Sequence, residues 1–382
     1  MTATAHRRRA LLRLLALAGA SAAWPVGADH PAAPAFDTAM RDWLLRHRVK
    51  NASFALMHDD RLVLAQGHGE RGAHERVPLW SLSKAITAAC VAALVRDGRL
   101  RLHDRIGPLL QPVFDAHGPP VDARVTKATV AQLLSHRAGW PGTRNFAPGF
   151  VPLLQQVPLG EARASMLMPA ILKTPLARDP GIRFEYSNTG YLLLGQIVEA
   201  VTGMGYAEAC QKLVLAPAGI AQVGMDRVWG RLLHAAGGWS MSAPEYLAFL
   251  RLLRPRKPDF LSAPVRDWMS DGRHETHEAF GGPGFAYTLG MHLRLRTGDL
   301  FHAGAWSWRQ DGPDGPALRQ GAWAGLGADG TAFVATFDTI SPSHDAAAAG
   351  ELDAMVWRLQ RAGGRYPAID LFDAAGVGPL RL

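Results

Sequence analysis

PLWSLSKAITAACVAALVR, residues 78–96, is the stretch of this chain that decides its fold. From Ser81 to Val95 the residues are mostly small or apolar, and none is Gly or Pro. This composition predicts a buried helix. Asp97-Gly98 follows, and Gly98 can supply the left-handed conformation that ends a helix.

Ser81 and Lys84 stand three positions apart at the start of the predicted helix. Residues spaced by three share one helix face, so the serine hydroxyl would lie beside the lysine amine. Unpaired N–H groups at a helix start stabilise an oxyanion, and a buried lysine has a lowered pKa and can accept a proton. The pair therefore predicts an activated nucleophile. The alternative is a helix-capping serine followed by a lysine that reaches the solvent.

The choice of lysine at position 84 favours the catalytic interpretation. The chain has 41 Lys plus Arg residues, but only six of them are Lys. Arginine thus meets most needs for positive charge in this protein. A lysine within an apolar helix then indicates that an amine able to lose its proton is required there.

Residues 1–28 have the pattern of an export signal. Arg7, Arg8 and Arg9 precede an apolar run from Leu14 to Ala23, and Val26-Gly27-Ala28 has the small residues of a cleavage site. The two arginines before Ala10-Leu11-Leu12-Arg13 also resemble a twin-arginine signal. The apolar run is too short to cross a bilayer, and we expect no stable membrane span after processing. An uncleaved N-terminal anchor is the alternative.

The charge balance gives little support for nucleic-acid binding. The formal net charge is +8, but without residues 1–28 it is +4, from 37 basic and 33 acidic residues. The basic residues are scattered and form no block with aromatic residues, so we expect no nucleic-acid partner.

The chain has two cysteines, Cys90 and Cys210, and both are predicted to be buried thiols; a disulfide between them is the alternative. His274-Glu275-Thr276-His277 lacks zinc-protease spacing, so we interpret it as a polar loop and expect no metal.

The order of strand-like and helix-like segments predicts an α/β (α+β) fold. A helix over 36–49 precedes a hairpin of 53–57 and 62–66, and helices dominate from 100 to 271. Strands follow at 285–295, 300–303, 318–326 and 331–338, with a last helix at 345–362. We therefore expect one domain over 29–382. Its antiparallel sheet lobe, covered by terminal helices, comprises about 36–100 and 272–382, and an all-α lobe over about 101–271 is inserted.

Two further stretches carry candidate partners for Ser81 and Lys84. Tyr186-Ser187-Asn188 precedes an apolar helix, where a phenol can shuttle a proton and an amide can orient an amine or a substrate. Asn188 is also a candidate N-cap of that helix. His302-Ala303-Gly304 lies at the end of a predicted strand, where Gly304 would let substrate lie along the strand edge. The N–H of Ala305 would be an oxyanion donor.

Together these stretches resemble the serine β-lactamase and penicillin-binding-protein family, in its class C β-lactamase, DD-peptidase and esterase branch. Leu133–Trp140 and Ala236–Ser242 are similar to the family too. The resemblance covers the chain from about Phe36 to the last helix. It implies that Ser81 is acylated, that Lys84 and Tyr186 are the acid–base pair, and that Asn188 positions substrate. It also implies that the Ser81 and Ala305 N–H groups form the oxyanion hole.

Two departures from the family pattern bear on the substrate. His302 stands where typical β-lactamases have Lys, and a neutral histidine binds a substrate carboxylate weakly. Trp306 and Trp308 stand where small residues are usual, and they would narrow the cleft or favour an apolar acyl group. The sequence thus predicts an exported, periplasmic or secreted serine hydrolase without cofactor, acting on a small ester, amide or peptide. Esterase or D-amino-acid peptidase activity is favoured; a β-lactamase and an inactive peptidoglycan-associated binding module are the alternatives.

Overall fold

The computed structural model describes residues 33–142, 146–254, 260–271, 277–279, 282–309, 317–338, 345–362, 366 and 369–382. The predicted export signal lies outside these residues, as do positions 274–276 of the predicted polar loop. No helix in the described part of the chain is long and apolar enough to cross a membrane.

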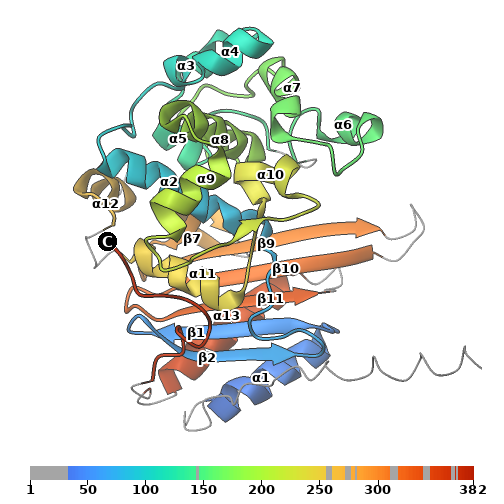
Figure 1. The fold of residues 1–382 in the computed structure, drawn as a ribbon, viewed down its shortest axis with the longest axis vertical. Helices are drawn as coiled ribbons and strands as arrows, with labels where there is room; N and C mark the ends of the chain where they lie inside the picture. The colour runs from blue at the N-terminus through green and yellow to red at the C-terminus, as the bar shows by residue number, and fades with distance from the viewer. Residues whose placement is uncertain are drawn as a thin grey trace, which may run out of the picture.

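One large antiparallel sheet organises the structure (Figure 1). Its described strands follow the order β2-β1-β11-β10-β9-β8-β7-β6. Strands from the two ends of the chain therefore pair within this sheet, β1 with β11, as the α+β prediction requires. The strands are β1 (Ala52–His58), β2 (Arg61–His68), β6 (His277–Ala279), β7 (Gly282–Thr288), β8 (Met291–Arg294), β9 (Leu300–Arg309), β10 (Ala317–Leu326) and β11 (Ala332–Asp338).

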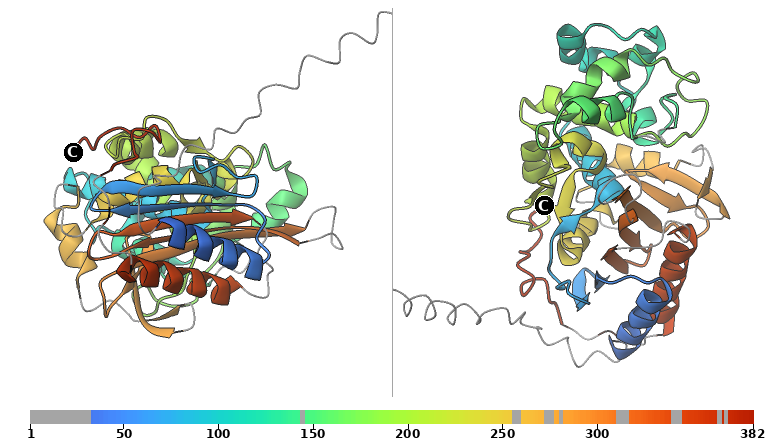
Figure 2. Two further views of the ribbon diagram at one scale, coloured as in Figure 1. Left: turned by 90° about the horizontal axis from the view of Figure 1, so that it is seen from below. Right: turned by 90° about the vertical axis from the view of Figure 1, so that its right-hand side faces the viewer.

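The two faces of this sheet are covered by different layers. Side chains alternate along a strand, so Phe54 and Leu56 of β1 face one layer while Ala55 and Met57 face the other. The first layer consists of α1 (Ala33–Arg46) and α13 (Asp345–Ala362), which lie side by side under the sheet in Figure 2. The second layer is the helical lobe, with α2 (Ser83–Arg96) at its centre.

The helical lobe packs around α2, of whose 14 residues 12 are buried. Its other α-helices are α3 (Ile106–Leu109), α4 (Gln111–His117), α5 (Val130–Leu134), α6 (Phe150–Gln156), α7 (Met168–Leu172), α8 (Asn188–Thr202), α9 (Tyr206–Cys210), α10 (Gly230–Gly237), α11 (Ala243–Leu250) and α12 (Ala263–Met269). Cys90 of α2 and Cys210 of α9 are both buried free thiols. Burial, and then the neighbouring Cys90 thiol, raise the pKa of Cys210.

The α/β fold class is confirmed, and several element boundaries are corrected. The segment 285–295, predicted as one strand, is the hairpin β7–β8, because Leu289 and Gly290 turn at positive φ. Strand β9 extends six residues beyond the predicted end at Ala303. Within the predicted helical stretch of 100–271, several elements are short, such as the 3-10 turn Ala164–Leu167 that leads into α7. A small sheet of β3 (Val77–Pro78), β5 (Trp239–Met241) and β4 (Gly224–Met225) was not predicted.

Candidate active site

Ser81 lies in a 3-10 turn, Trp80–Leu82, that leads into α2, so the predicted helix starts two residues later than expected. Trp80 has a φ of 51°, an uncommon value for a residue with a side chain, which marks local backbone strain. Both sides of the turn are fixed to Trp239 of β5. The N–H of Leu79 donates to the Trp239 carbonyl at 2.8 Å, and the Trp239 N–H donates to Ser83 Oγ at 3.0 Å.

Lys84 is fully buried, and its Nζ has three oxygen partners. It lies 3.0 Å from Ser81 Oγ, 2.8 Å from Asn188 Oδ1 and 2.7 Å from the carbonyl oxygen of Ala236. Burial lowers the pKa of Lys84 well below its ordinary value of 10.5. The structure therefore brings Ser81 and Lys84 together as predicted, and Lys84 does not reach the solvent.

Tyr186 joins the same serine from the loop before α8. Its hydroxyl donates to Ser81 Oγ at 2.9 Å. Burial raises the pKa of this phenol, with the hydrogen bond to Ser81 as a smaller opposing effect. The buried phenol therefore keeps its proton through the neutral pH range, and it meets the nucleophile as a proton donor.

His136, from the stretch after α5, holds the Tyr186 loop from two sides. Its carbonyl accepts the N–H of Glu185 at 2.8 Å, and its Nδ1 accepts the N–H of Ser187 at 3.2 Å. Its ring lies 4.3 Å from the Tyr186 ring, measured between centroids. The residues on either side of Tyr186 are thus both bound to His136. This role of His136, which lies within the family-like stretch Leu133–Trp140, was not predicted from the sequence.

Asn188 is the first residue of α8, and the N-cap position is Ser187. The alternative interpretation of Asn188 as an N-cap is therefore wrong. Its Oδ1 instead accepts a hydrogen bond from Lys84. The amide thus orients the amine from the helix that follows Tyr186.

Strand β9 runs beside the turn that carries Ser81. A Cβ at Gly304 would lie 2.1 Å from the carbonyl oxygen of Leu79 and 3.2 Å from the Ser81 nitrogen. Only glycine allows this approach. In the described sheet β8 pairs with β9 only at Leu300 and Phe301, so the edge of β9 beyond them has no strand partner. Ala305 follows Gly304 and is exposed, which leaves this part of the strand open to a ligand.

His302 is buried, with 2% of its surface exposed, and both ring nitrogens are engaged within the protein. Nε2 lies 2.8 Å from the Tyr287 hydroxyl and Nδ1 2.6 Å from the Ala303 carbonyl oxygen. Burial, and then the Lys84 charge, lower the pKa of His302 to about 3. The ring is therefore neutral. This geometry favours a role in positioning over the direct substrate contact that the sequence predicted.

Trp306 is the centre of an aromatic cluster beside the nucleophile. Its indole stacks on that of Trp80, with centroids 5.7 Å apart and planes at 15°. Trp229 lies 5.1 Å from it, and two phenylalanine rings contact its face edge-on. The five members of this cluster, hereafter the tryptophan cluster, are Trp80, Phe146, Phe150, Trp229 and Trp306. The second predicted tryptophan, Trp308, has a side chain outside the described part of the structure.

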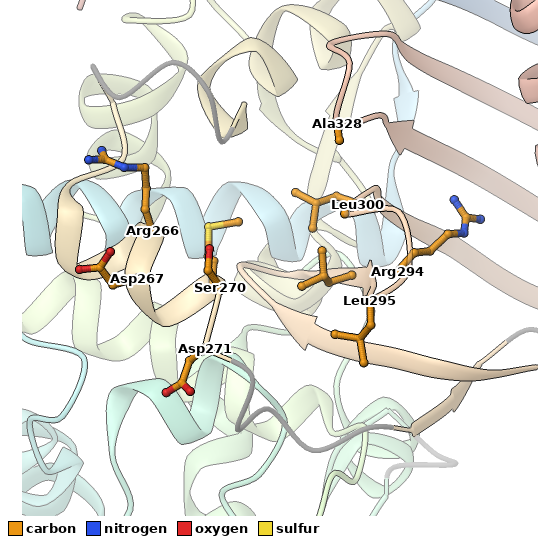
Figure 3. A pocket seen from close by; sticks show the side chains of 11 residues that line it. Arg266, Asp267, Ser270, Asp271, Arg294, Leu295, Leu300 and Ala328 are labelled. Atoms are coloured by element: carbon orange, nitrogen blue, oxygen red, sulfur yellow. The ribbon is translucent and has the colours of Figure 1, made fainter.

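Elsewhere, Figure 3 shows a pocket between α12 and the strands β8 and β9. Its arginines already have partners: Arg266 donates to the Leu261 carbonyl, and Arg294 donates to Asp353 at 2.6 Å. None of the predicted site residues lines it. Within the described residues, no group of three or more His, Cys, Asp or Glu side chains is placed to hold a metal ion. Ser81 therefore remains the centre of the candidate site.

Comparison with known proteins shows the family of this chain. The profile of the Beta-lactamase family matches residues 32–339. The chain therefore belongs to the beta-lactamase family and is a serine hydrolase by family.

The related sequences are only partly matched. Protein flp of Staphylococcus aureus (strain NCTC 8325 / PS 47) is 24% identical over 213 residues, which is 54% of this chain and 41% of that protein. Penicillin-binding protein 4 of Amycolatopsis lactamdurans is 30% identical over 184 residues, which is 46% of this chain and 45% of the relative. The chain thus spans less than half the length of these relatives.

Solved structures extend the likeness over most of the chain. EstCE1, a hydrolase with promiscuous acyltransferase activity, has a TM-score of 0.68 at 16% identity, covering 86% of this chain and 99% of that one. The D-amino acid amidase from Ochrobactrum anthropi SV3 has a TM-score of 0.62 at 18% identity, covering 85% and 98%. At these identities the likeness shows a shared fold.

Proposed function

We propose that this protein is an exported serine hydrolase that forms an acyl-enzyme on Ser81, with esterase or D-amino-acid peptidase activity. One observation carries the proposal. Ser81 Oγ lies 3.0 Å from the Lys84 amine and 2.9 Å from the Tyr186 hydroxyl at once. Acyl transfer to a serine needs a base that takes the proton of the hydroxyl and an acid that gives a proton to the leaving group. Ser81 has a candidate for each within hydrogen-bonding distance.

The partners of Lys84 support its proposed role as the base. A neutral amine has two hydrogens and one lone pair. The oxygens of Asn188 and Ala236 accept hydrogen bonds and have no proton to give, so they take the two hydrogens. The lone pair then faces Ser81 Oγ. As Oγ attacks the substrate carbonyl carbon, its proton passes to Lys84.

The leaving group receives its proton from Tyr186. When the bond between the carbonyl carbon and the leaving atom breaks, the phenol protonates that atom, and the ammonium of Lys84 restores the proton to the phenolate. The Lys84 Nζ lies 5.0 Å from the centre of the Tyr186 ring. Until that proton is returned, the positive charge of the ammonium stabilises the phenolate. The N–H groups of Ser81 and Ala305 hold the oxyanion in this proposal. Water then releases the acyl group by the reverse sequence.

Two arguments favour esters or D-amino-acid amides and peptides over β-lactams. His302 is neutral and buried, so it supplies no fixed positive charge for a substrate carboxylate. Proteins of the same fold carry names that describe hydrolase, acyltransferase and D-amino acid amidase activities. We therefore expect slow turnover of β-lactams, although they can acylate the serine.

Export is supported by the sequence alone, through the arginines and the apolar run of residues 1–28. Expression of the full chain in a bacterium, followed by fractionation and intact-mass measurement, tests it. We expect a periplasmic or secreted product that has lost about 28 residues. A full-length product in the cytoplasm would contradict export.

The catalytic proposal is tested with a fluorophosphonate and a penicillin-type probe, read out by intact mass. We expect a stable adduct on Ser81 that is absent from Ser81→Ala. Ser83→Ala is the matched control, because Ser83 belongs to the same motif but bonds to the Trp239 N–H. Folding of each variant is checked by circular dichroism. An unlabelled wild-type protein would instead support the inactive binding module.

A further inference from the structure

Two groups of aromatic side chains lie near Ser81, one that includes Tyr186 and one that includes Trp80. The Tyr186 side is polar: Tyr186 contacts the rings of His136, Tyr287 and His302. The second group is the tryptophan cluster, whose members carry no charge. Tyr186 is the proposed proton donor, so the leaving group must lie on its side. The acyl group stays on Ser81 and must lie away from Tyr186, where it can lie against the tryptophan cluster.

The tryptophan cluster is anchored next to both proposed oxyanion donors. Trp80 directly precedes Ser81, and Trp306 directly follows Ala305. The stacked Trp80 and Trp306 rings therefore span the space between the nucleophile turn and β9. A carbonyl group held by these two N–H groups would carry its substituent past one or both indoles.

The exposure of the rings allows such a contact. Trp80 is buried, with 2% of its surface exposed, so it forms the base of the cluster. Trp306 and Trp229 are half-buried, so part of each indole faces solvent. Ser81 is half-buried too, so the nucleophile itself is partly accessible. Partly exposed aromatic faces beside a nucleophile gain free energy when an apolar group covers them.

We propose that the tryptophan cluster is an acyl-binding site that selects esters or amides with an aromatic acyl group. The inference rests on the proposed acyl-enzyme at Ser81. A flat ring stacks on the exposed part of Trp306 in offset or edge-to-face geometry, as Phe146 and Phe150 already do from within the protein. A short acyl group such as acetyl does not reach these faces and leaves them in water.

The experiment keeps the leaving group constant and varies the acyl group. Values of kcat/KM for p-nitrophenyl acetate, cyclohexylacetate and phenylacetate are each divided by the rate of spontaneous hydrolysis of the same ester. We expect the wild-type protein to prefer phenylacetate to acetate by about ten- to hundredfold. Trp306→Ala should lower that ratio about tenfold, and Trp306→Phe should keep most of it.

Trp357→Ala is the matched control, since Trp357 is a half-buried indole on α13, on the opposite side of the sheet. In this variant the ratio of the corrected kcat/KM for phenylacetate to that for acetate should equal the wild-type ratio. If Ser81 is acylated but Trp306→Ala leaves the ratio unchanged, the acyl site is wrong and the acyl-enzyme stands. If no ester acylates Ser81, the proposed function itself fails. A preference for cyclohexylacetate over phenylacetate would overturn the aromatic selectivity.

Discussion

The carbonyl oxygen of Ala236 accepts a 2.7 Å hydrogen bond from Lys84 two residues after a kink in α10. At the kink, His234 has φ 45° and ψ −128°, far from helical values. Ala235 and Ala236 follow in the last turn of α10, where carbonyls have no helical partner. Ala235 then accepts from Thr87 Oγ1 at 2.7 Å, and Ala236 accepts from Lys84. The end of α10 thus supplies α2 with two fixed acceptors, one of which directs the amine of the proposed base.

The first prediction concerns pH. Lys84 acts as a base only when it is neutral, so activity should fall as the pH falls through its pKa. Because burial lowers that pKa well below 10.5, the acid limb of the kcat/KM profile should lie well below pH 10. Lys84→Arg should lose about 10²- to 10⁴-fold in activity, since a guanidinium stays protonated. A profile that rises only near the ordinary lysine pKa would contradict the neutral base.

Tyr186→Phe should impair poor leaving groups most. The variant keeps the ring but removes the hydroxyl that contacts Ser81. We expect a loss of about 10²- to 10⁴-fold for alkyl esters, whose alkoxide needs a proton on leaving. The loss should be much smaller for p-nitrophenyl esters, whose leaving group departs as an anion. Equal losses for both ester types would mean that Tyr186 does not protonate the leaving group.

His136→Ala should act through Tyr186. It removes the acceptor of the Ser187 N–H and the ring that packs on Tyr186, at a cost of about 1–3 kcal/mol in stability. Kinetically it should lower kcat more than it raises KM, and it should share the leaving-group dependence of Tyr186→Phe. Thermal unfolding and steady-state kinetics with alkyl and p-nitrophenyl esters measure both effects. A loss of stability without that dependence would make His136 merely structural.

Two glycines offer a matched pair of substitutions. Gly304→Ala should reduce kcat about 10²- to 10³-fold, because its Cβ would push β9 away from the carbonyl of Leu79 and displace the Ala305 N–H. Gly350→Ala lies within α13 with nothing within 4 Å of its Cβ. It should raise the free energy of unfolding by about 0.5–1 kcal/mol and leave kcat unchanged. An active Gly304→Ala variant would contradict the proposed oxyanion strand.

Local patterns in the sequence were enough to predict the parts of the site that depend on spacing. Ser81 and Lys84 share a turn, so their contact follows from helix geometry. Tyr186 and Asn188 were predicted as partners from their residue types and from the family resemblance, and the structure brings both to the pair. Their assignment to catalysis remains a proposal.

The contacts that arise from backbone direction and long-range packing could not be predicted. The Ala236 carbonyl is chemically like any other, and it meets Lys84 because α10 ends there and packs against α2. Likewise the hairpin turn at Gly290 was hidden within an apolar run. A Cβ there would lie 2.5 Å from the backbone of Lys84, a proximity that no local pattern encodes. The burial of His302 also depends on its partner Tyr287, from another strand.

The pairing of β1 with β11 has a consequence for the biosynthesis of the protein. Ser81 is translated 223 positions before Gly304, so the reactive serine leaves the ribosome long before β9 exists. Contacts so distant in sequence form late and slowly. A nascent or truncated chain therefore has the alcohol but not the strand edge that would hold its substrate. We therefore expect hydrolysis to begin only after β9 has joined the sheet and Gly304 lies against the turn that carries Ser81.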